Sequence, residues 1–214
     1  MPMKFPNINP AQFKPAAEFS SPIREQDVLR LAHACRYEQK HAEQVARIAL
    51  RLFDELQDLH RLGRTERSWL KTAGLLHDIG WIEGRKKHHK TARRIILETA
   101  LLPLGLRARR ILGEIVRYHR KALPQLGHRG FRALTMDNRK VVLVLAGLLR
   151  VADGLDVSHA SVVKDLTCRI TRTRIAALCR VAGPADAERS AALKKGRLLE
   201  SVFNRKLMIL CRPI

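Results

Sequence analysis

The sequence has only four cysteines among 214 residues, and no two of them show the CxxC spacing of a thiolate zinc site. A chain of this length needs no disulfide to stabilise its fold. Reduced, buried cysteines in a cytoplasmic protein are therefore expected at all four positions, which are Cys35, Cys168, Cys179 and Cys211.

The sequence also lacks a hydrophobic segment that could cross a membrane. Its longest apolar run, Val141 to Leu149, ends at Arg150 and is too short for a bilayer, so it predicts a buried helix. The N-terminal segment MPMKFPNINPAQFKP has no apolar core of a secretory signal. Its prolines oppose both helix and central strand, which predicts a flexible leader over residues 1–20. No membrane partner is expected.

Acidic residues are few: 20 Asp and Glu stand against 41 Lys and Arg, which gives a formal net charge of +21. A solvated basic surface accounts for part of this surplus, and charge does not determine a fold. The surplus nevertheless favours anionic partners such as nucleic acid, polyphosphate, nucleotides or an acidic membrane surface. With 46% hydrophobic residues, the chain can still bury a sizeable core.

Apolar residues recur at helical spacing from Ile23 to about Val157, which predicts a mainly α-helical body over residues 21–159. After His159 the apolar residues alternate with polar ones, as in strands. Two such runs, 165–170 and 175–181, predict a hairpin, and a helix and a further strand follow it. The expected fold class is thus mainly α, with a C-terminal ββαβ unit over residues 160–214. The helices predicted with bounds cover residues 65–79, 91–99, 138–155 and 186–202, and the last strand covers 207–211.

Histidine and aspartate side chains lie on the apolar faces of these predicted helices. His77 and Asp78 close one helix, His119 and Asp153 each continue an apolar stripe, and His41 directly precedes another. A single buried histidine is more often a hydrogen-bonded core residue, and a single aspartate near a helix end is more often a cap. Buried ionisable groups are costly unless they are paired or bind metal. Imidazole and carboxylate together suit Mn, Fe, Zn, Ni or Co, so the set as a whole predicts a metal site.

The order of His41, His77-Asp78 and Asp153 resembles that of the HD phosphohydrolase superfamily, which is named after its His-Asp doublet. A closer resemblance, from about Ile23 to the C-terminus, is to the C-terminal HD region of exopolyphosphatase and guanosine pentaphosphate phosphohydrolase proteins. It implies an HD-type helical bundle with metal-dependent phosphohydrolase activity. Six ordered segments carry it: YEQKHAEQVARIALRLFDEL, LLHDIG, HHKTARRII, IVRYHRKALP, LAGLLRVADGLDVSH and KKGRLLESVFNRKL.

The resemblance also implies ligands for one or two divalent ions, drawn from Mn, Fe, Mg, Ni, Co and Zn. His88 or His89, together with His119, match positions that build a second metal site in some HD enzymes. The first metal set is implied to be His41, His77, Asp78 and Asp153.

Two positions depart from the family pattern. Thr91 stands where another histidine is common, which puts the second ion in doubt. Asn204 stands where glycine is common before the last strand, but asparagine tolerates a left-handed backbone, so the fold should accept it.

The implied chemistry is phosphate hydrolysis, with Asp78 and His119 as the candidate catalytic residues. A divalent cation polarises a phosphoryl oxygen and lowers the pKa of a coordinated water. Basic residues cluster beside the candidate histidines, and Arg and Lys are the side chains that bind phosphate. Each one alone is more simply explained as part of a solvated face. The candidate phosphate-binding residues are Lys86, Lys87, Lys90, Arg120 and Lys121, with Arg93, Arg94 and Arg117 nearby.

Three functions stay open at this stage. In the related phosphatases the polyphosphate-cleaving site lies in N-terminal actin-like ATPase domains, and no glycine-rich phosphate loop precedes the helices of this sequence. Any catalysis is therefore expected from the HD site itself, on a nucleotide or another small phosphate compound. The alternatives are a non-catalytic module that binds polyphosphate or RNA, and a subunit that docks on a separate phosphatase chain through the ββαβ unit. A homodimer also stays open.

Overall fold

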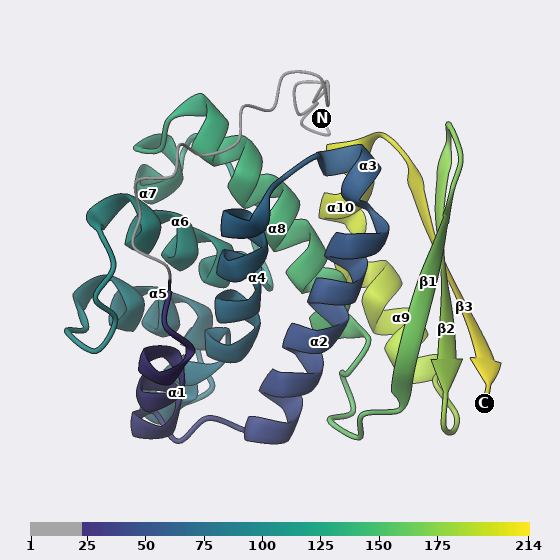
Figure 1. The fold of residues 1–214 in the computed structure, drawn as a ribbon, viewed down its shortest axis with the longest axis horizontal. Helices are drawn as coiled ribbons and strands as arrows, with labels where there is room; N and C mark the ends of the chain where they lie inside the picture. The colour runs from purple at the N-terminus through teal and green to yellow at the C-terminus, as the bar shows by residue number, and fades with distance from the viewer. Residues whose placement is uncertain (1–22) are drawn as a thin grey trace.

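The computed structural model describes residues 23–214, so the leader predicted over residues 1–20 lies outside the described residues. A body of helices lies beside a small sheet, and the helices α9 and α10 pack between the two (Figure 1). The helices of the body are α1 (Glu25–Ala34), α2 (Gln39–Glu55), α3 (Gln57–His60), α4 (Arg64–Leu76), the 3-10 helix η2 (Ile79–Glu83), α5 (His88–Glu98), α6 (Leu106–Arg117), α7 (Arg129–Arg132) and α8 (Met136–Gly154). The C-terminal unit consists of β1 (Val163–Ile170), β2 (Arg174–Val181), α9 (Asp186–Lys195), α10 (Arg197–Phe203) and β3 (Lys206–Pro213).

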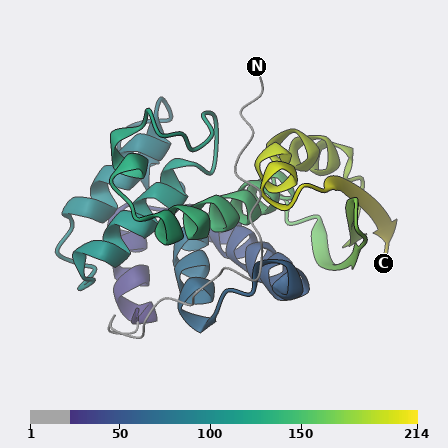
Figure 2. The same ribbon diagram turned by 90° about the horizontal axis from the view of Figure 1, so that it is seen from above.

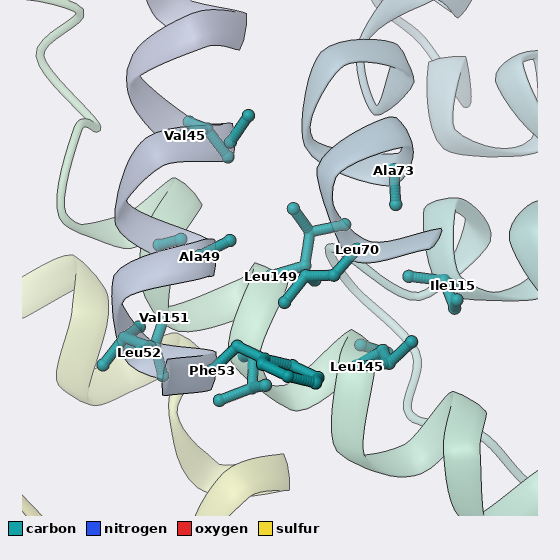
Figure 3. Close-up of a cluster of buried hydrophobic side chains, with 14 of the residues drawn as sticks. Val45, Ala49, Leu52, Phe53, Leu70, Ala73, Ile115, Leu145, Leu149 and Val151 are labelled. Atoms are coloured by element: carbon teal, nitrogen blue, oxygen red, sulfur yellow. The ribbon is translucent and has the colours of Figure 1, made fainter. Parts of the chain in front are cut away.

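The core of the body forms where α2, α4, α6 and α8 face one another. Apolar side chains at helical spacing on each helix point inward and fill the space between them (Figure 3). Burial of such stripes is the main source of helix stability in proteins, because the isolated helices are marginal in water. The fully buried contributors include Val45, Ala49, Leu70, Ile115, Leu145 and Leu149.

Helix α8 is buried on all sides rather than along one stripe. Every residue from Val141 to Gly154 is buried. The helix contacts α2, α4 and α6 with one side and α9 and α10 with the other, and it runs from the body to the C-terminal unit in Figure 2. A helix that is apolar all round needs partners on every face, so the nearly unbroken run from Val141 to Leu149 is explained by this central position.

The predicted fold class is confirmed, since the chain is mainly helical with a small C-terminal sheet. The sheet has the order β1-β2-β3, with β1 antiparallel and β3 parallel to β2. The prediction of a single helix over residues 186–202 is wrong, because the helix is interrupted at Gly196, which separates α9 from α10. A Cβ at Gly196 would lie 2.4 Å from Leu207 Cδ2 and 2.9 Å from the backbone oxygen of Ala192. Asn204 adopts the left-handed backbone expected of it, with φ 49° and ψ 45°.

Helix α9 lies very close to the end of α8. A Cβ on Gly154 would lie only 2.5 Å from Cα of Ala192, so these two small residues let the helix backbones approach. The guanidinium of Arg150, one turn earlier, donates from Nε to the backbone oxygen of Lys195 (3.1 Å) and from Nη1 to that of Tyr118 (2.9 Å). These contacts fix the last turn of α9 against the ends of α6 and α8.

The helix predicted over residues 65–79 ends earlier than expected. Helix α4 stops at Leu76, His77 and Asp78 form a turn, and the short helix η2 follows. Gly80 acts there through close packing and not as a helix stop, because a Cβ on it would lie 2.1 Å from the backbone oxygen of His88. Helix α5 correspondingly begins at His88 rather than at Thr91.

None of the helices in residues 23–214 combines the length and the apolar character that a membrane crossing requires.

Candidate metal centre

The candidate ligands converge because each lies at a helix end. His41 is in the first turn of α2, and His88 is the first residue of α5. His77 follows the end of α4 and His119 follows the end of α6, while Asp153 is in the last turn of α8. Apolar stripes carry these five helices into one core, so side chains at their meeting ends point into a common space.

The structure places the ligand atoms in two groups, each of which could hold a metal ion. One group comprises His41, His77 and Asp153, and the other comprises Asp78, His88 and His119; within each group all ligand atoms lie within 4.8 Å of one another. In the first group His41 Nε2 is 3.3 Å from His77 Nε2 and 3.8 Å from Asp153 Oδ1. In the second group His88 Nε2 is 3.2 Å from His119 Nε2.

Asp78 lies between the two groups. Its Oδ1 atom is 2.9 Å from His88 Nε2 and 3.4 Å from His119 Nε2, while its Oδ2 atom is 3.5 Å from His77 Nε2. The carboxylate therefore presents one oxygen to each group. The four residues predicted from the sequence as one set do come together, but Asp78 is grouped with His88 and His119 and reaches the first group through its second oxygen.

The hydrogen bonds of the four histidines fix which ring nitrogen is free. Nδ1 of His77 lies 2.8 Å from the backbone oxygen of Gly74, Nδ1 of His88 lies 3.0 Å from that of Arg85, and Nδ1 of His119 lies 2.7 Å from that of Val116. A carbonyl oxygen only accepts, so each Nδ1 must carry the proton. Nδ1 of His41 likewise donates to Asp156 Oδ2 (2.8 Å). In each ring that carries this single proton, the Nε2 lone pair points toward the Nε2 atom of the neighbouring ring.

Two Nε2 lone pairs that face each other repel, and a cation between them relieves that repulsion. Asp78 Oδ1 is buried and has no hydrogen-bond partner among the described residues, although two imidazole nitrogens face it. An unpaired buried acceptor is costly, and metal-binding histidines typically donate their second ring nitrogen to a carbonyl or carboxylate. The two groups of ligand atoms, together with the unpaired Oδ1 atom of Asp78, therefore fit divalent cations.

Burial and neighbouring charges set the protonation states that a metal requires. Burial lowers the pKa of His119 to about 3, so its ring is neutral near pH 7. Burial acts to raise the pKa of Asp78, but the positive charge that the neighbouring imidazoles, His77 first, carry when they are protonated outweighs this and holds that pKa well below its usual range. Burial likewise opposes ionisation of Asp153, and Lys195 with His77 lowers its pKa on balance. Neutral imidazole and ionised carboxylate are the ligand forms.

A cavity of about 290 Å³ opens beside both groups. Asp78, His88, His119 and Asp153 form part of its wall. Trp81, Val157 and His159 add an aromatic and apolar wall, and two cations, Arg120 and Lys195, also line the cavity. The guanidinium Nη1 of Arg120 lies 3.3 Å from His88 Nε2, so this charge sits directly at the second group.

Several predicted site residues lie outside this centre. His89 is buried but belongs to neither group, and its Nδ1 has no hydrogen-bond partner in the described part of the chain. Arg93 pairs with Glu114, and Arg94 pairs with Glu83 and Glu98. Of the five predicted phosphate-binding residues, Arg120 lines the cavity. The other four are exposed and do not line it: Lys86, Lys87, Lys90 and Lys121.

Sequence reasoning missed three residues that shape the centre: Asp156, His159 and Lys195. Asp156 is fully buried and holds His41, and the ring of His159 stacks on that of His41 at a centroid distance of 3.7 Å. Asp156 follows Asp153 by three residues, in the turn just beyond α8, so the spacing of the two aspartates was a usable signal. Lys195 comes from a helix distant in sequence, and only the fold brings it to the site.

We expect Asp156→Asn to weaken metal binding by about 10- to 100-fold, as for other residues that orient a ligand. Both carboxylate oxygens of Asp156 accept N–H groups, one from His41 and one from the backbone of Ser161. An amide would turn its NH2 group against one of these donors and displace the imidazole. Chelator competition would measure the dissociation constant, with the exposed Asp186→Asn as the control. An unchanged constant would show that Asp156 is not needed to orient His41.

The sequence matches the family described as Ppx/GppA phosphatase, domain III, over residues 23–193. No curated protein matches it.

Proposed function

Because the chain belongs to the Ppx/GppA phosphatase domain III family, we propose that it is a metal-dependent phosphohydrolase of the HD type. Its substrate would be a nucleotide or another small phosphate ester or anhydride. The observation that carries this proposal is the pair of ligand groups joined by Asp78, with free Nε2 lone pairs and a cavity that two cations line.

The first ion would be held by His41, His77 and Asp153, the second by His88 and His119, and Asp78 would serve both. Divalent cations at such a site polarise a phosphoryl oxygen and acidify water. The protein's part is to bury the rings and to orient them through their Nδ1 hydrogen bonds.

The remaining residues of the cavity would bind and enclose the substrate. Arg120 offers planar donors to phosphate oxygens, and Trp81 with His159 shields one side from water. The volume of about 290 Å³ lies just below the usual range for ligand pockets. This size favours a phosphate group with a small substituent over a bulky substrate.

His119→Ala should lower the rate of phosphate release by more than tenfold, which corresponds to at least about 1.4 kcal/mol of barrier. The change removes one ligand of the second group but leaves the first group complete. The measurement is phosphate release from a panel of nucleotides and simple phosphate esters with Mn, Mg, Co and Ni, after the metal content of the purified protein is known. Lys86→Met is the control, since Lys86 is exposed and outside the cavity. Equal rates in both variants would contradict the assigned role of His119.

The net charge of +21 supports a second candidate function, a module that binds polyphosphate or RNA without turnover. Exposed lysines outside the cavity, such as Lys86 and Lys87, would then carry the binding. Affinity should in that case fall steeply with added salt, because bound counterions return to the polyanion. It should be nearly unchanged by His119→Ala. Binding at two salt concentrations, measured beside phosphate release, separates the two functions.

A further inference from the structure

We propose that Lys195, which the C-terminal unit supplies, is a phosphate-binding residue of the cavity. The proposal deepens the proposed function and rests on the same site. Lys195 Nζ lies 2.6 Å from Asp153 Oδ2, and the side chain lines the cavity together with Arg120. The C-terminal unit would then complete the site, in addition to covering α8.

The position of Lys195 is fixed by its backbone. It is the last residue of α9, and its carbonyl oxygen accepts the hydrogen bond from Arg150. The close approach of Ala192 to Gly154 places α9 directly against the end of α8 that carries Asp153. Because backbone contacts set the last turn of α9, the Cα atom of Lys195 is held near the cavity, and its side chain lines the cavity wall.

The ion pair with Asp153 leaves capacity for a further ligand. An ammonium group has three N–H donors, and Asp153 Oδ2 uses one of them. The side chain of Lys195 is 25% exposed, whereas that of Asp153 is 11% exposed, so the lysine is the more accessible member of the pair. The other carboxylate oxygen, Oδ1, faces His41 at 3.8 Å. Asp153 therefore turns one oxygen to the metal group and the other to Lys195.

Electrostatics favour an anion beside this lysine. A divalent cation held by Asp153 would compete with Lys195 for the charge of the same carboxylate, and the two cations would repel each other. A bound phosphate would offset that repulsion and accept hydrogen bonds from the remaining N–H donors of Lys195. Arg120 adds another positive charge at the second group, so a phosphate compound in the cavity would meet one cation beside each ligand group.

The test measures binding of inorganic phosphate by calorimetry to the full chain, loaded with the divalent ion that the purified protein retains. Lys195→Met and Lys195→Gln should each weaken phosphate binding by at least tenfold without loss of metal, and Lys195→Arg should restore most of the affinity. Lys194→Met is the matched control, because Lys194 is the adjacent lysine and is exposed. Lys195→Gln keeps a donor for Asp153, so it remains informative if the methionine variant folds poorly.

Two results would overturn the proposal. One is unchanged phosphate affinity in the folded Lys195→Gln variant. The other is loss of metal from both Lys195→Gln and Lys195→Met, which would mean that the lysine acts by holding Asp153. The measurement needs no turnover, so failure of the hydrolase proposal, seen as absent phosphate release, is distinguishable from failure of this one.

Discussion

Asp78→Ala should remove metal from both ligand groups at once and abolish phosphate release. Asp78 is the ligand whose two oxygens face both groups, at 2.9 Å from His88 Nε2 and 3.5 Å from His77 Nε2. Each group would be left with histidine nitrogens and at most one carboxylate, and the proposed ions would lose the charge that they share. Elemental analysis of the purified variant and a phosphate-release assay measure the two effects.

Thermal stability gives a second readout for Asp78→Ala. Metal that binds only the folded chain stabilises it by mass action, so the variant should melt below the wild-type protein when metal is present. In excess chelator the difference should vanish or reverse, because the substitution also removes a buried oxygen that lacks a hydrogen-bond partner. Asp58→Ala, at an exposed position, is the control. Retention of metal by Asp78→Ala, or an equal loss of stability with and without metal, would contradict the assigned role.

Much of the candidate site could be predicted because its residues share the periodicity of the core. His119 and Asp153 continue apolar helical stripes, and a stripe that faces the core carries its polar members there too. His77 and Asp78 were marked by their place at a helix end. These signals are local, and each could be found within one helix.

The remaining features depend on how each helix is rotated about its axis and on contacts between residues far apart in the sequence. His88 and His89 are adjacent in the first turn of α5, and the sequence alone does not say which ring meets His119; in the fold it is His88, whose backbone packs against Gly80. Alternation predicted the strands but not that β3 lies parallel to β2, because the pattern of one strand does not specify its partner. Lys195 was hidden for the same reason, since its contact with Asp153 spans 42 residues.

Deletion of residues 162–214 should cause aggregation of the truncated chain, although all six proposed metal ligands remain in it. We propose a boundary between the helical body and the C-terminal unit near residue 160, but the two parts share one apolar core. The deletion would expose the side of α8 that α9 and α10 cover, including the contact of Gly147 with Leu199. It would also leave Arg47 and Arg51 of α2 without the β1 carbonyl oxygens to which they donate.

Size-exclusion chromatography and thermal melting would measure this effect. A point substitution distinguishes the loss of packing from the loss of the deleted residues themselves. Leu199→Asp, at a fully buried position of α10, should lower the stability of the full-length protein, as the deletion does. An exposed counterpart on the same helix, Ser201→Asp, should have little effect. If the truncated chain instead stays monomeric and as stable as the full chain, the C-terminal unit is an independent module. Lys195 would then reach the cavity from a separately folded part. Phosphate binding by the truncated chain should in that case be restored when the C-terminal unit is added in trans.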